Sequence, residues 1–502
     1  VLEIALDSYV APILLLANIG IAILYNMGTN IFLGEISYIT KAISAVLQLG
    51  VTMDFAIFLY HSYQAELKNT TDRNQAMSIA ISKTFTSVLG SSLTTIAGFL
   101  ALCSMNLTLG KDIGIVMAKG VLFGVISVVT ILPSLILMFD KAIQKTKHKE
   151  LLPKFTTISE FNIKHYKAII VIFLIALPIA LYGYNNTKVY YKLDSSLPET
   201  LDSISANNTL KDKFGLVSQE MILINKDTPN DEINEMLDKI EELDGVDFTL
   251  SYSKLSELGI PEEMLPEDLL SIFQTDKYQM ILINSKYEIA TDELNNQIAK
   301  INEIVKQYDS NAKVVGEGPL MKDLVEISDH DFNSVNTVSI GIIFVIMMFV
   351  LKSISLPVLL VIAIEFAIFI NMGIPYYTNT TIPFIASIVI GTIQLGATID
   401  YAILITTKYI QNRKDGKDKK QAVSEALGTS INSIIVSGLC FFGATFGVGA
   451  YSKIEMIGSL CTLMSRGAII SVIVVITVLP AFLMIFDKLV CKTTIGMREV
   501  KN

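Results

Sequence analysis

Two aspartates in near-identical apolar stretches are the residues of this sequence best suited to chemistry. Residues 49–57 read LGVTMDFAI and contain Asp54, and residues 395–403 read LGATIDYAI and contain Asp400. An ionised group near the centre of a bilayer costs roughly 2.5 to 17 kcal/mol, depending on the method of measurement, so intramembrane acids are treated as functional by default. Two acids at matching positions favour a site that binds and releases a cation, most simply a proton.

A glycine precedes each acid by one helical turn. Gly50 lies four residues before Asp54 and Gly396 four before Asp400, so on an α-helix each glycine shares a face with its acid. Small residues at such positions let a neighbouring helix approach closely. We therefore predict that both glycines are helix-packing residues. In the dry interface that results, desolvation disfavours the charged carboxylate and so eases proton exchange. The alternative is a neutral acid that only hydrogen-bonds an adjacent helix.

The residue after each acid differs between the two stretches. Asp54 is followed by Phe55 and Asp400 by Tyr401. If the two helices face each other, Tyr401 can offer its hydroxyl to Asp54, but Phe55 has no hydroxyl to offer to Asp400. We therefore count Tyr401 with the two acids as a proton-coupling residue, and we expect Asp54 to be the better satisfied acid.

Three further charges fall inside apolar stretches. Lys119 and Arg466 occupy matching positions in the two halves, whereas Glu365 aligns with Gly20 and belongs to one half only. Lys119 and Arg466 are candidate counter-ions of the aspartates, and the alternative is that they snorkel to the membrane interface. Glu365 is a candidate second proton site or substrate contact, against a buried structural hydrogen bond.

Helices rich in serine and threonine are predicted after each acid-bearing helix. Such hydroxyls could form a polar relay to the acids, although they more often bond back to their own helix. The residues concerned are Ser87, Ser91, Ser92, Thr94 and Thr95 in one half, and Ser430, Ser433, Ser437 and Thr445 in the other.

The composition indicates a polytopic α-helical membrane protein. Hydrophobic residues make up 51% of the 502 residues and charged residues only 17%, which is too apolar for an ordinary soluble enzyme. A membrane-spanning helix needs about 20 mostly apolar residues. The segments that qualify are 8–27, 36–60, 85–106, 112–139, 166–186, 335–352, 354–375, 382–406, 429–451 and 455–487.

The two halves form an internal repeat. Four predicted helices in each half correspond, and the loops that follow the two acid-bearing helices are expected on the same side of the membrane, which makes the repeat parallel. The second half has two additional helices around a polar segment, so we expect that equivalent parts precede residue 1 in the intact protein. The predicted regions are a first bundle at 1–142, a linker at 143–165, a helix at 166–186, a polar domain at 187–334, a second bundle at 335–488 and a tail at 489–502.

The polar domain is acidic and has an α+β pattern. Residues 187–334 contain 13 Lys and Arg against 30 Asp and Glu, a net charge of −17, which argues against binding nucleic acid. Strands are predicted at 218–225 and 277–285 and helices at 230–243 and 290–308. Two strand–helix–strand units favour a split βαβ fold of ferredoxin-like type. We find no catalytic constellation in this domain, and the four cysteines of the chain predict neither a disulfide framework nor a zinc site.

Basic loops set the expected orientation. The connections near 140–165 and 407–428 are rich in lysine, and short lysine-rich loops face the cytoplasm. We therefore expect a multi-pass protein of the cytoplasmic membrane, with the acidic domain extracellular or periplasmic and the C-terminus cytoplasmic.

The paired motif resembles that of a known family. Gly-x-x-x-Asp-[Phe/Tyr]-Ala occurs once in each half and is followed by a basic loop and a Leu-Pro helix. This pattern is similar to that of the RND superfamily of proton-driven exporters, in particular its MMPL-type branch for hydrophobic and amphiphilic compounds. The resemblance implies twelve spans with two ferredoxin-like porter domains, and proton movement through the positions of Asp54 and Asp400. In that family tyrosines pair with the opposite acid, so Phe55 departs from the pattern.

What the resemblance implies is a secondary transporter and not an enzyme. It would use a proton gradient and no bound cofactor or metal, with membrane lipids and a hydrophobic or lipid-like substrate as partners; formation of a homo-oligomer stays open. Two other functions are considered: a lipid- or sterol-sensing membrane protein, and an accessory component of protein export. No Gly-x-x-x-x-Gly-Lys-[Ser/Thr] phosphate loop occurs in the sequence, which argues against an ATP-driven transporter.

Overall fold

The computed structural model describes residues 1–70, 72–149, 156–191, 197, 200–257 and 271–497. The chain divides into two compact units. Unit 1 consists of Val1–Val189 and Asp331–Asn502, and unit 2 is Tyr190–His330. Unit 1 is helical and carries all the intramembrane charges discussed above.

Long apolar helices make up unit 1. Among the described residues, nine helices are long and apolar enough to cross a membrane, and α4 adds a tenth as a pair of segments, Arg73–Phe85 and Val88–Ser104, bent by 44°. The prediction of a polytopic helical membrane protein is therefore confirmed. The helices are α2 (Ala11–Gly28), α3 (Tyr38–Glu66), α4 (Arg73–Ala101), α5 (Thr108–Lys145), α6 (Thr156–Asn185), α12 (Glu317–Leu351), α13 (Ser355–Tyr377), α14 (Phe384–Lys414), α15 (Lys419–Tyr451) and α16 (Glu455–Thr493).

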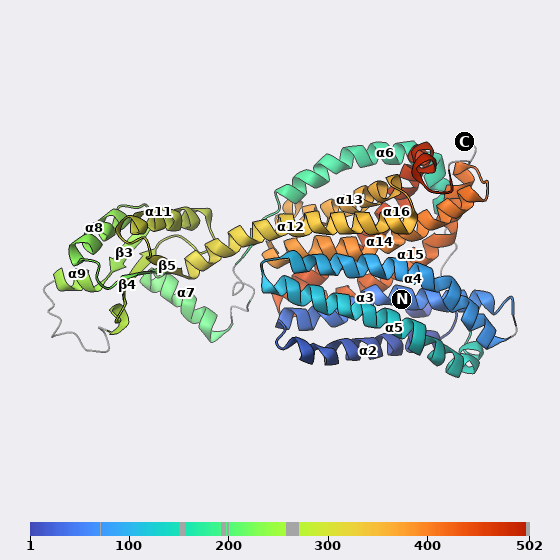
Figure 1. Cartoon of the computed structure of the whole chain (residues 1–502), viewed down its shortest axis with the longest axis horizontal. Coiled ribbons are helices and arrows are strands. Elements are labelled where there is room, and N and C mark those ends of the chain that lie inside the picture. Colours follow the sequence, from blue (N-terminus) through green and yellow to red (C-terminus); the bar gives the residue numbers. More distant parts are fainter. Residues whose placement is uncertain (71, 150–155, 192–196, 198–199, 258–270, 498–502) are drawn as a thin grey trace. The chain divides into compact units, whose positions relative to one another are not determined.

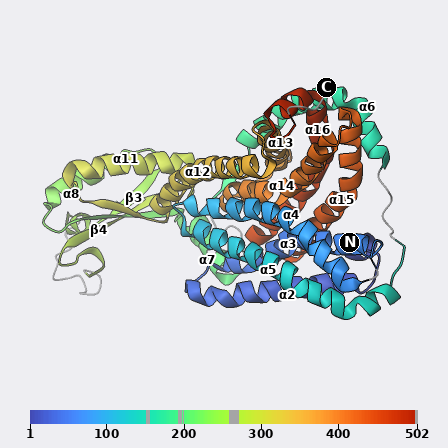
Figure 2. The same cartoon turned by 45° about the vertical axis from the view of Figure 1, so that its right-hand side comes forward.

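The sequence repeat is also a repeat in space. Helices α2, α3, α4 and α5 lie together, and α13, α14, α15 and α16 form a second group (Figure 1, Figure 2). The acid-bearing helices cross between the groups, because α3 packs against α15 and α14 packs against α4. Matching residues also begin matching helices: the side chains of Asp72 and Asp418 accept hydrogen bonds from the first-turn amides of α4 and α15. Such caps satisfy amides that have no partner within the helix.

The last helix of each half continues past its apolar part. Helix α16 extends to Thr493, beyond the predicted boundary at 488, and its polar last turns include Asp487. The carboxylate of Asp487 accepts a hydrogen bond from Tyr409 and forms an ion pair with Arg413, whose Nε lies 3.0 Å from Oδ1. Arg413 and Asp487 have side chains only 3% and 5% exposed. Hydropathy marks only the apolar part of such a helix, so it ended this helix too early.

Helix α5 repeats this arrangement with weaker shielding from solvent. Asp140 accepts a hydrogen bond from Tyr63 at 3.0 Å and lies 2.9 Å from Nε of Arg73. The Arg73 side chain is 46% exposed, in contrast to Arg413. The two ends of the repeat therefore share a Tyr–Asp–Arg cluster, which the sequence analysis did not identify.

Unit 2 contains an antiparallel sheet of four strands in the order β3-β4-β2-β5. Its strands and main helices form two strand–helix–strand units in sequence: β2 (Ser218–Asn225), α8 (Asn230–Glu241) and β3 (Val246–Leu250), then β4 (Tyr278–Ser285), α11 (Asp292–Tyr308) and β5 (Lys313–Gly316). The strands predicted at 218–225 and 277–285 are thus present, and helices α8 and α11 lie in the segments predicted as helical. The register pairs Ser218 with Ser285 and Asn225 with Tyr278 across β2 and β4.

The core of unit 2 lies between its sheet and helices α8 and α11. Alternate residues of β2, Ile222 and Ile224, are fully buried against Ile233 and Leu237 of α8 and Ile301 of α11. The two-residue period of the strand and the 3.6-residue period of the helices direct these apolar faces toward each other. Shorter elements complete the described chain: α1 (Leu2–Ala5), η1 (Thr29–Leu33), η2 (Leu102–Ser104), β1 (Val189–Tyr190), α7 (Asp202–Phe214), α9 (Tyr252–Glu257) and β6 (Ile382–Pro383).

Candidate functional site

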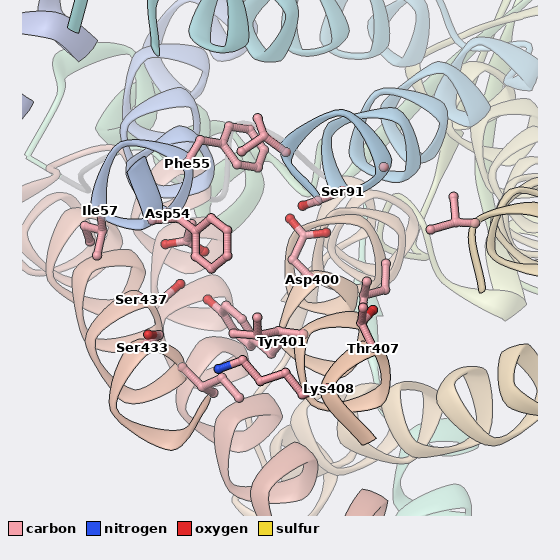
Figure 3. Close-up of a pocket in the computed structure, with 17 residues that line it drawn as sticks. Asp54, Phe55, Ile57, Ser91, Asp400, Tyr401, Thr407, Lys408, Ser433 and Ser437 are labelled. Carbon is pink, nitrogen blue, oxygen red and sulfur yellow. The ribbon is translucent and has the colours of Figure 1, made fainter. Parts of the chain in front are cut away.

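The two aspartates face one cavity inside unit 1. Asp54 of α3 and Asp400 of α14 both line a cavity of about 300 Å³, whose walls come from α3, α4, α12, α14 and α15 (Figure 3). The two acids lie 346 positions apart in the sequence and belong to different repeats. The cavity therefore lies at the contact between the repeats.

Each carboxyl group has a hydroxyl neighbour from a helix of the opposite repeat. Ser437 of α15 lies beside Asp54, and Ser91 of α4 lies beside Asp400 (Figure 3). The Oδ1 atom of each acid is buried and has no hydrogen-bond partner in the described part of the chain. The two carboxyl groups are close enough for their charges to interact. Among the described residues, each acid therefore presents a buried carboxyl oxygen without a partner at the contact between the repeats.

Tyr401 is buried and directs its hydroxyl toward Ser437 and Asp54 (Figure 3). Asp54 thus faces two hydroxyl groups, whereas the hydroxyl beside Asp400 is that of Ser91. No hydrogen bond joins Tyr401 to Asp54 among the described residues, so the expectation that Asp54 is the better satisfied acid stays a prediction. Ser437, which the sequence analysis named only as one of several hydroxyls, is the neighbour shared by Tyr401 and Asp54.

Both glycines lie at contacts between the repeats. A Cβ atom on Gly50 would come within 2.5 Å of Cδ2 of Phe441 on α15. At Gly396, the nearest atom to an added Cβ would be the carbonyl oxygen of Thr95 on α4, at 3.7 Å. The Thr95 hydroxyl in turn donates a hydrogen bond of 3.0 Å to the carbonyl oxygen of Gly396. The contact at Gly50 is therefore much the tighter one.

Lys119 belongs to a network of amides in the first repeat. Its Nζ donates a hydrogen bond of 2.6 Å to the side-chain oxygen of Asn30. On the next residue, the carbonyl oxygen of Gly120 accepts from Gln48 at 2.9 Å, and Gln48 in turn accepts from Asn26 at 2.9 Å. A side chain at Gly120 would lie within 2.6 Å of Asn26, so glycine is needed there for this network.

Arg466 belongs to the corresponding network of the second repeat. It donates to the side-chain and backbone oxygens of Asn371 at 2.9 and 2.7 Å. Asn371 donates to Gln394 at 2.8 Å, and Gln394 donates to the carbonyl oxygen of Gly467 at 3.4 Å. Within the described residues, neither Lys119 nor Arg466 forms an ion pair with an aspartate of the cavity. The structure therefore gives no contact that supports their interpretation as counter-ions.

Glu365 lies apart from the two aspartates. It is half-buried on α13 and is not among the residues that line the cavity. Its charge is close enough to interact with Tyr184 of α6, whose hydroxyl accepts a hydrogen bond of 3.3 Å from Asn336 of α12. Glu365 is thus near a second polar contact, between helices of the second half.

The serine- and threonine-rich helices divide into two kinds of hydroxyl. Ser92, Thr94 and Thr445 bond back to carbonyl oxygens of their own helices. In contrast, Ser91, Ser433 and Ser437 line the cavity, and the side chain of Ser87 lies outside the described part of the structure. The internal repeat carries a signal that separates the two groups, which the sequence analysis did not use: Ser87 and Ser91 stand 346 positions before Ser433 and Ser437, the offset that also relates the two acids.

Sequence analysis missed one charged residue of the cavity, Lys408. It follows Asp400 by eight residues on α14 and lines the cavity with both acids. Its position in a lysine-rich predicted loop concealed it, because α14 continues to Lys414 and so includes this residue in a helix.

Comparison with known proteins agrees with this architecture. The model of the MMPL family matches residues 1–158 and 268–495. ActII-3 of Streptomyces coelicolor is 23% identical over 472 residues, which cover 91% of this chain and 63% of that protein. The mycolic acid-containing lipids exporter MmpL11 of Mycolicibacterium smegmatis is 23% identical over 36% of this chain and 19% of its own length. The siderophore exporter MmpL5 of Mycobacterium tuberculosis is 22% identical over 35% of this chain and 18% of its own length.

The chain thus spans less than two thirds of the length of these relatives. The family match extends over most of the sequence, includes both aspartates and both repeats, and agrees with the nine apolar helices and the bent pair. The chain is a membrane protein that belongs to the MMPL family of transporters.

Proposed function

We propose that this protein is a secondary transporter that uses the proton gradient to export hydrophobic, amphiphilic or lipid-like compounds across or from the cytoplasmic membrane. The observation that carries the proposal is that Asp54 and Asp400, one from each repeat, face the same cavity. An acid that alternates between charged and neutral forms changes how strongly its helix favours a polar or a dry environment. Proton uptake and release therefore give a free-energy difference that can move one repeat against the other.

The route from proton to movement runs through the contacts beside the acids. Gly50 brings α3 against Phe441 of α15, and Gly396 brings α14 against Thr95 of α4. When an acid loses its proton, the charged group favours water in the cavity and the dry contact beside it is weakened. Because α3 and α14 each touch the opposite repeat, a change at one acid is transmitted to both groups of helices.

The cargo class is proposed from the relatives. One relative is named as an exporter of mycolic acid-containing lipids and another as a siderophore exporter. An apolar compound of this kind would reach the protein through the membrane, so lipids are its expected partners. We propose no resident cofactor, since the proton gradient supplies the free energy.

Unit 2 is proposed to be an extracytoplasmic porter domain of ferredoxin-like type. Two β-α-β units and the strand order β3-β4-β2-β5 support this fold. The net charge of −17 in residues 187–334 and the lysine-rich loops near 140–165 and 407–428 support its location outside and a cytoplasmic C-terminus.

Proton flux in liposomes tests the proposal. The reconstituted protein is given a pH gradient with and without an added lipid extract, and wild type is compared with Asp54→Asn and Asp400→Asn. Both changes keep the side-chain size and remove the titrating proton, so the lipid-dependent part of the flux should be lost. Asp415→Asn is the matched control, because Asp415 is an exposed carboxylate on the turn after α14. It should transport like wild type.

Unchanged lipid-dependent flux in both cavity variants would contradict the proposal and leave the acids with a structural role. If the protein bound lipid but wild type carried no flux, a lipid-sensing role would be the better account. If flux responded to an exported polypeptide and not to lipid, a role in protein export would be favoured.

A further inference from the structure

Lys408 places an ammonium group at one end of the cavity. Along α14 the cavity extends from Asp400 through Thr407 and Lys408, a distance of about 12 Å for eight residues of α-helix. Lys408 is half-buried and Thr407 is exposed, so this end of the cavity reaches the surface of unit 1. The end that contains Lys408 is also the end nearest to the turn between α14 and α15.

A hydrogen bond to the backbone of α15 holds the Lys408 side chain across the contact between α14 and α15. Its Nζ donates to the carbonyl oxygen of Thr429 on α15 at 2.8 Å. A carbonyl oxygen orients the ammonium group but does not neutralise its charge, and no ion pair of Lys408 occurs among the described residues. In the view of Figure 3 the ammonium group lies beyond Tyr401, on the side away from the two acids.

The two repeats differ at this position. Ser62 of α3 stands where α14 has Lys408, 346 positions later. The other charged or titratable groups that line the cavity are Asp54, Asp400 and Tyr401, and the helices α4, α12 and α15 contribute only uncharged side chains. The positive charge therefore lies at one end of the cavity, and the first repeat has no equivalent of it.

A fixed cation at the mouth of a pathway is a barrier to other cations. Pores that exclude protons use positive charges in this way. At a separation of about 12 Å and an effective dielectric constant of about 20, the repulsion between two unit charges lowers the population of an entering cation by about tenfold. The repulsion acts on any hydrated proton that enters or leaves at this end.

We propose that Lys408 is the electrostatic barrier that limits uncoupled proton leakage between the aspartates and the loop-side end of the cavity. The proposal rests on the proposed proton-coupled transport, and it assigns to Lys408 the role of preventing a proton flow that moves no cargo. The ammonium group is part of the proton pathway without being one of its exchanging acids.

The test measures passive proton flux in liposomes without added lipid extract. Lys408→Gln keeps a donor for the Thr429 carbonyl oxygen and removes the charge, whereas Lys408→Arg keeps the charge. Lys414→Gln is the matched control, because Lys414 is an exposed lysine further along the same helix that does not line the cavity. Passive flux should rise about tenfold in Lys408→Gln and stay at the wild-type level in Lys408→Arg and Lys414→Gln.

Two further measurements make the outcome decisive. Adding Asp54→Asn and Asp400→Asn to Lys408→Gln should return the flux to the wild-type level, because the leak passes through the acids. A Lys408→Gln protein with the thermal midpoint of wild type and no added leak would overturn the proposal. The passive leak is measured without lipid extract, and the coupled flux is measured with it. An unchanged leak in Lys408→Gln contradicts the role of Lys408 alone, whereas the absence of lipid-dependent flux in wild type contradicts the proposed transport function.

Discussion

Replacing Gly50 by alanine tests how closely the two repeats pack beside Asp54. The added Cβ would lie 2.5 Å from Cδ2 of Phe441, while the same change at Gly396 would meet nothing closer than 3.7 Å. Carbon atoms in good contact are about 3.5–4.0 Å apart. The Phe441 ring, which is only 4% exposed, must therefore retreat by about 1 Å in the Gly50 variant.

The loss of stability caused by the added methyl group is estimated by comparing Gly50→Ala with Gly396→Ala. Inserting an extra methyl group into a well-packed core costs about 1–3 kcal/mol. Alanine is favoured over glycine in a helix by about 1 kcal/mol, and this gain is common to both positions. The difference between Gly50→Ala and Gly396→Ala therefore isolates the overpacking, and we expect Gly50→Ala to be the less stable protein by about 1–3 kcal/mol.

Thermal unfolding of the purified protein in detergent measures this difference. A loss of 1 kcal/mol lowers the midpoint by about 2–4 °C in domains of about 150–250 residues, so the Gly50→Ala midpoint should be several degrees below that of Gly396→Ala. Phe441→Leu in the Gly50→Ala background removes ring atoms from the clash and should recover part of the loss. Equal midpoints, or a lower midpoint for Gly396→Ala, would refute the packing argument.

Two other predictions concern charges outside the cavity. Arg413→Ala leaves the buried Asp487 without its ion-pair partner and should cost about 3–5 kcal/mol of stability. Arg73→Ala also leaves a buried carboxylate, Asp140, but the Arg73 side chain is 46% exposed, so water already weakens this pair and the loss in the same unfolding assay should be smaller; an equal or larger loss would contradict the role of the arginine's burial. In unit 2, burial raises the pKa of the Glu220 carboxyl, so the folded domain keeps a proton on Glu220 at pH values where the unfolded chain has released it. The contribution of the protonated carboxyl to the stability of the folded domain is therefore present at acidic pH and is lost as the pH rises through the pKa of the folded state. Glu220→Gln should therefore slow hydrogen exchange in β2 relative to wild type at neutral pH and lose that advantage at acidic pH; an advantage independent of pH would argue against titration of Glu220.

The membrane helices were predictable from sequence because a bilayer demands long apolar segments. Their polar ends were not, since hydropathy gives no account of charged residues that have partners. Helix α16 reaches Thr493, past the predicted boundary at 488, and Arg413, which lies in a predicted loop, belongs to α14 and pairs with Asp487. Helix α4 begins at Arg73, before the apolar segment predicted at 85–106, and its first turn is capped by Asp72.

The two aspartates could be predicted as a pair, but most of their surroundings could not. The offset of 346 positions that relates the two acids also relates Ser91 to Ser437, so the repeat pairs these serines as well. What the repeat does not show is that each serine approaches the acid of the opposite repeat, which depends on packing. The same limit applies to Lys119 and Arg466. A charge inside an apolar segment indicates that a partner is needed, but the amide partners Asn30 and Asn371 lie on other helices and are chosen by packing.

The repeat is symmetric in its helices and asymmetric in its chemistry. At two positions the first repeat has a residue without a titrating group, Phe55 and Ser62, where the second has Tyr401 and Lys408. Helix α14 therefore contributes an acid, a phenol and an ammonium group to the cavity, and α3 contributes only its acid. Equivalent backbones with unequal side chains therefore place the two acids in different electrostatic surroundings. Under the proposed proton-coupled function, this asymmetry would let a proton pass between Asp54 and Asp400 in a defined order, which two identical repeats would not impose.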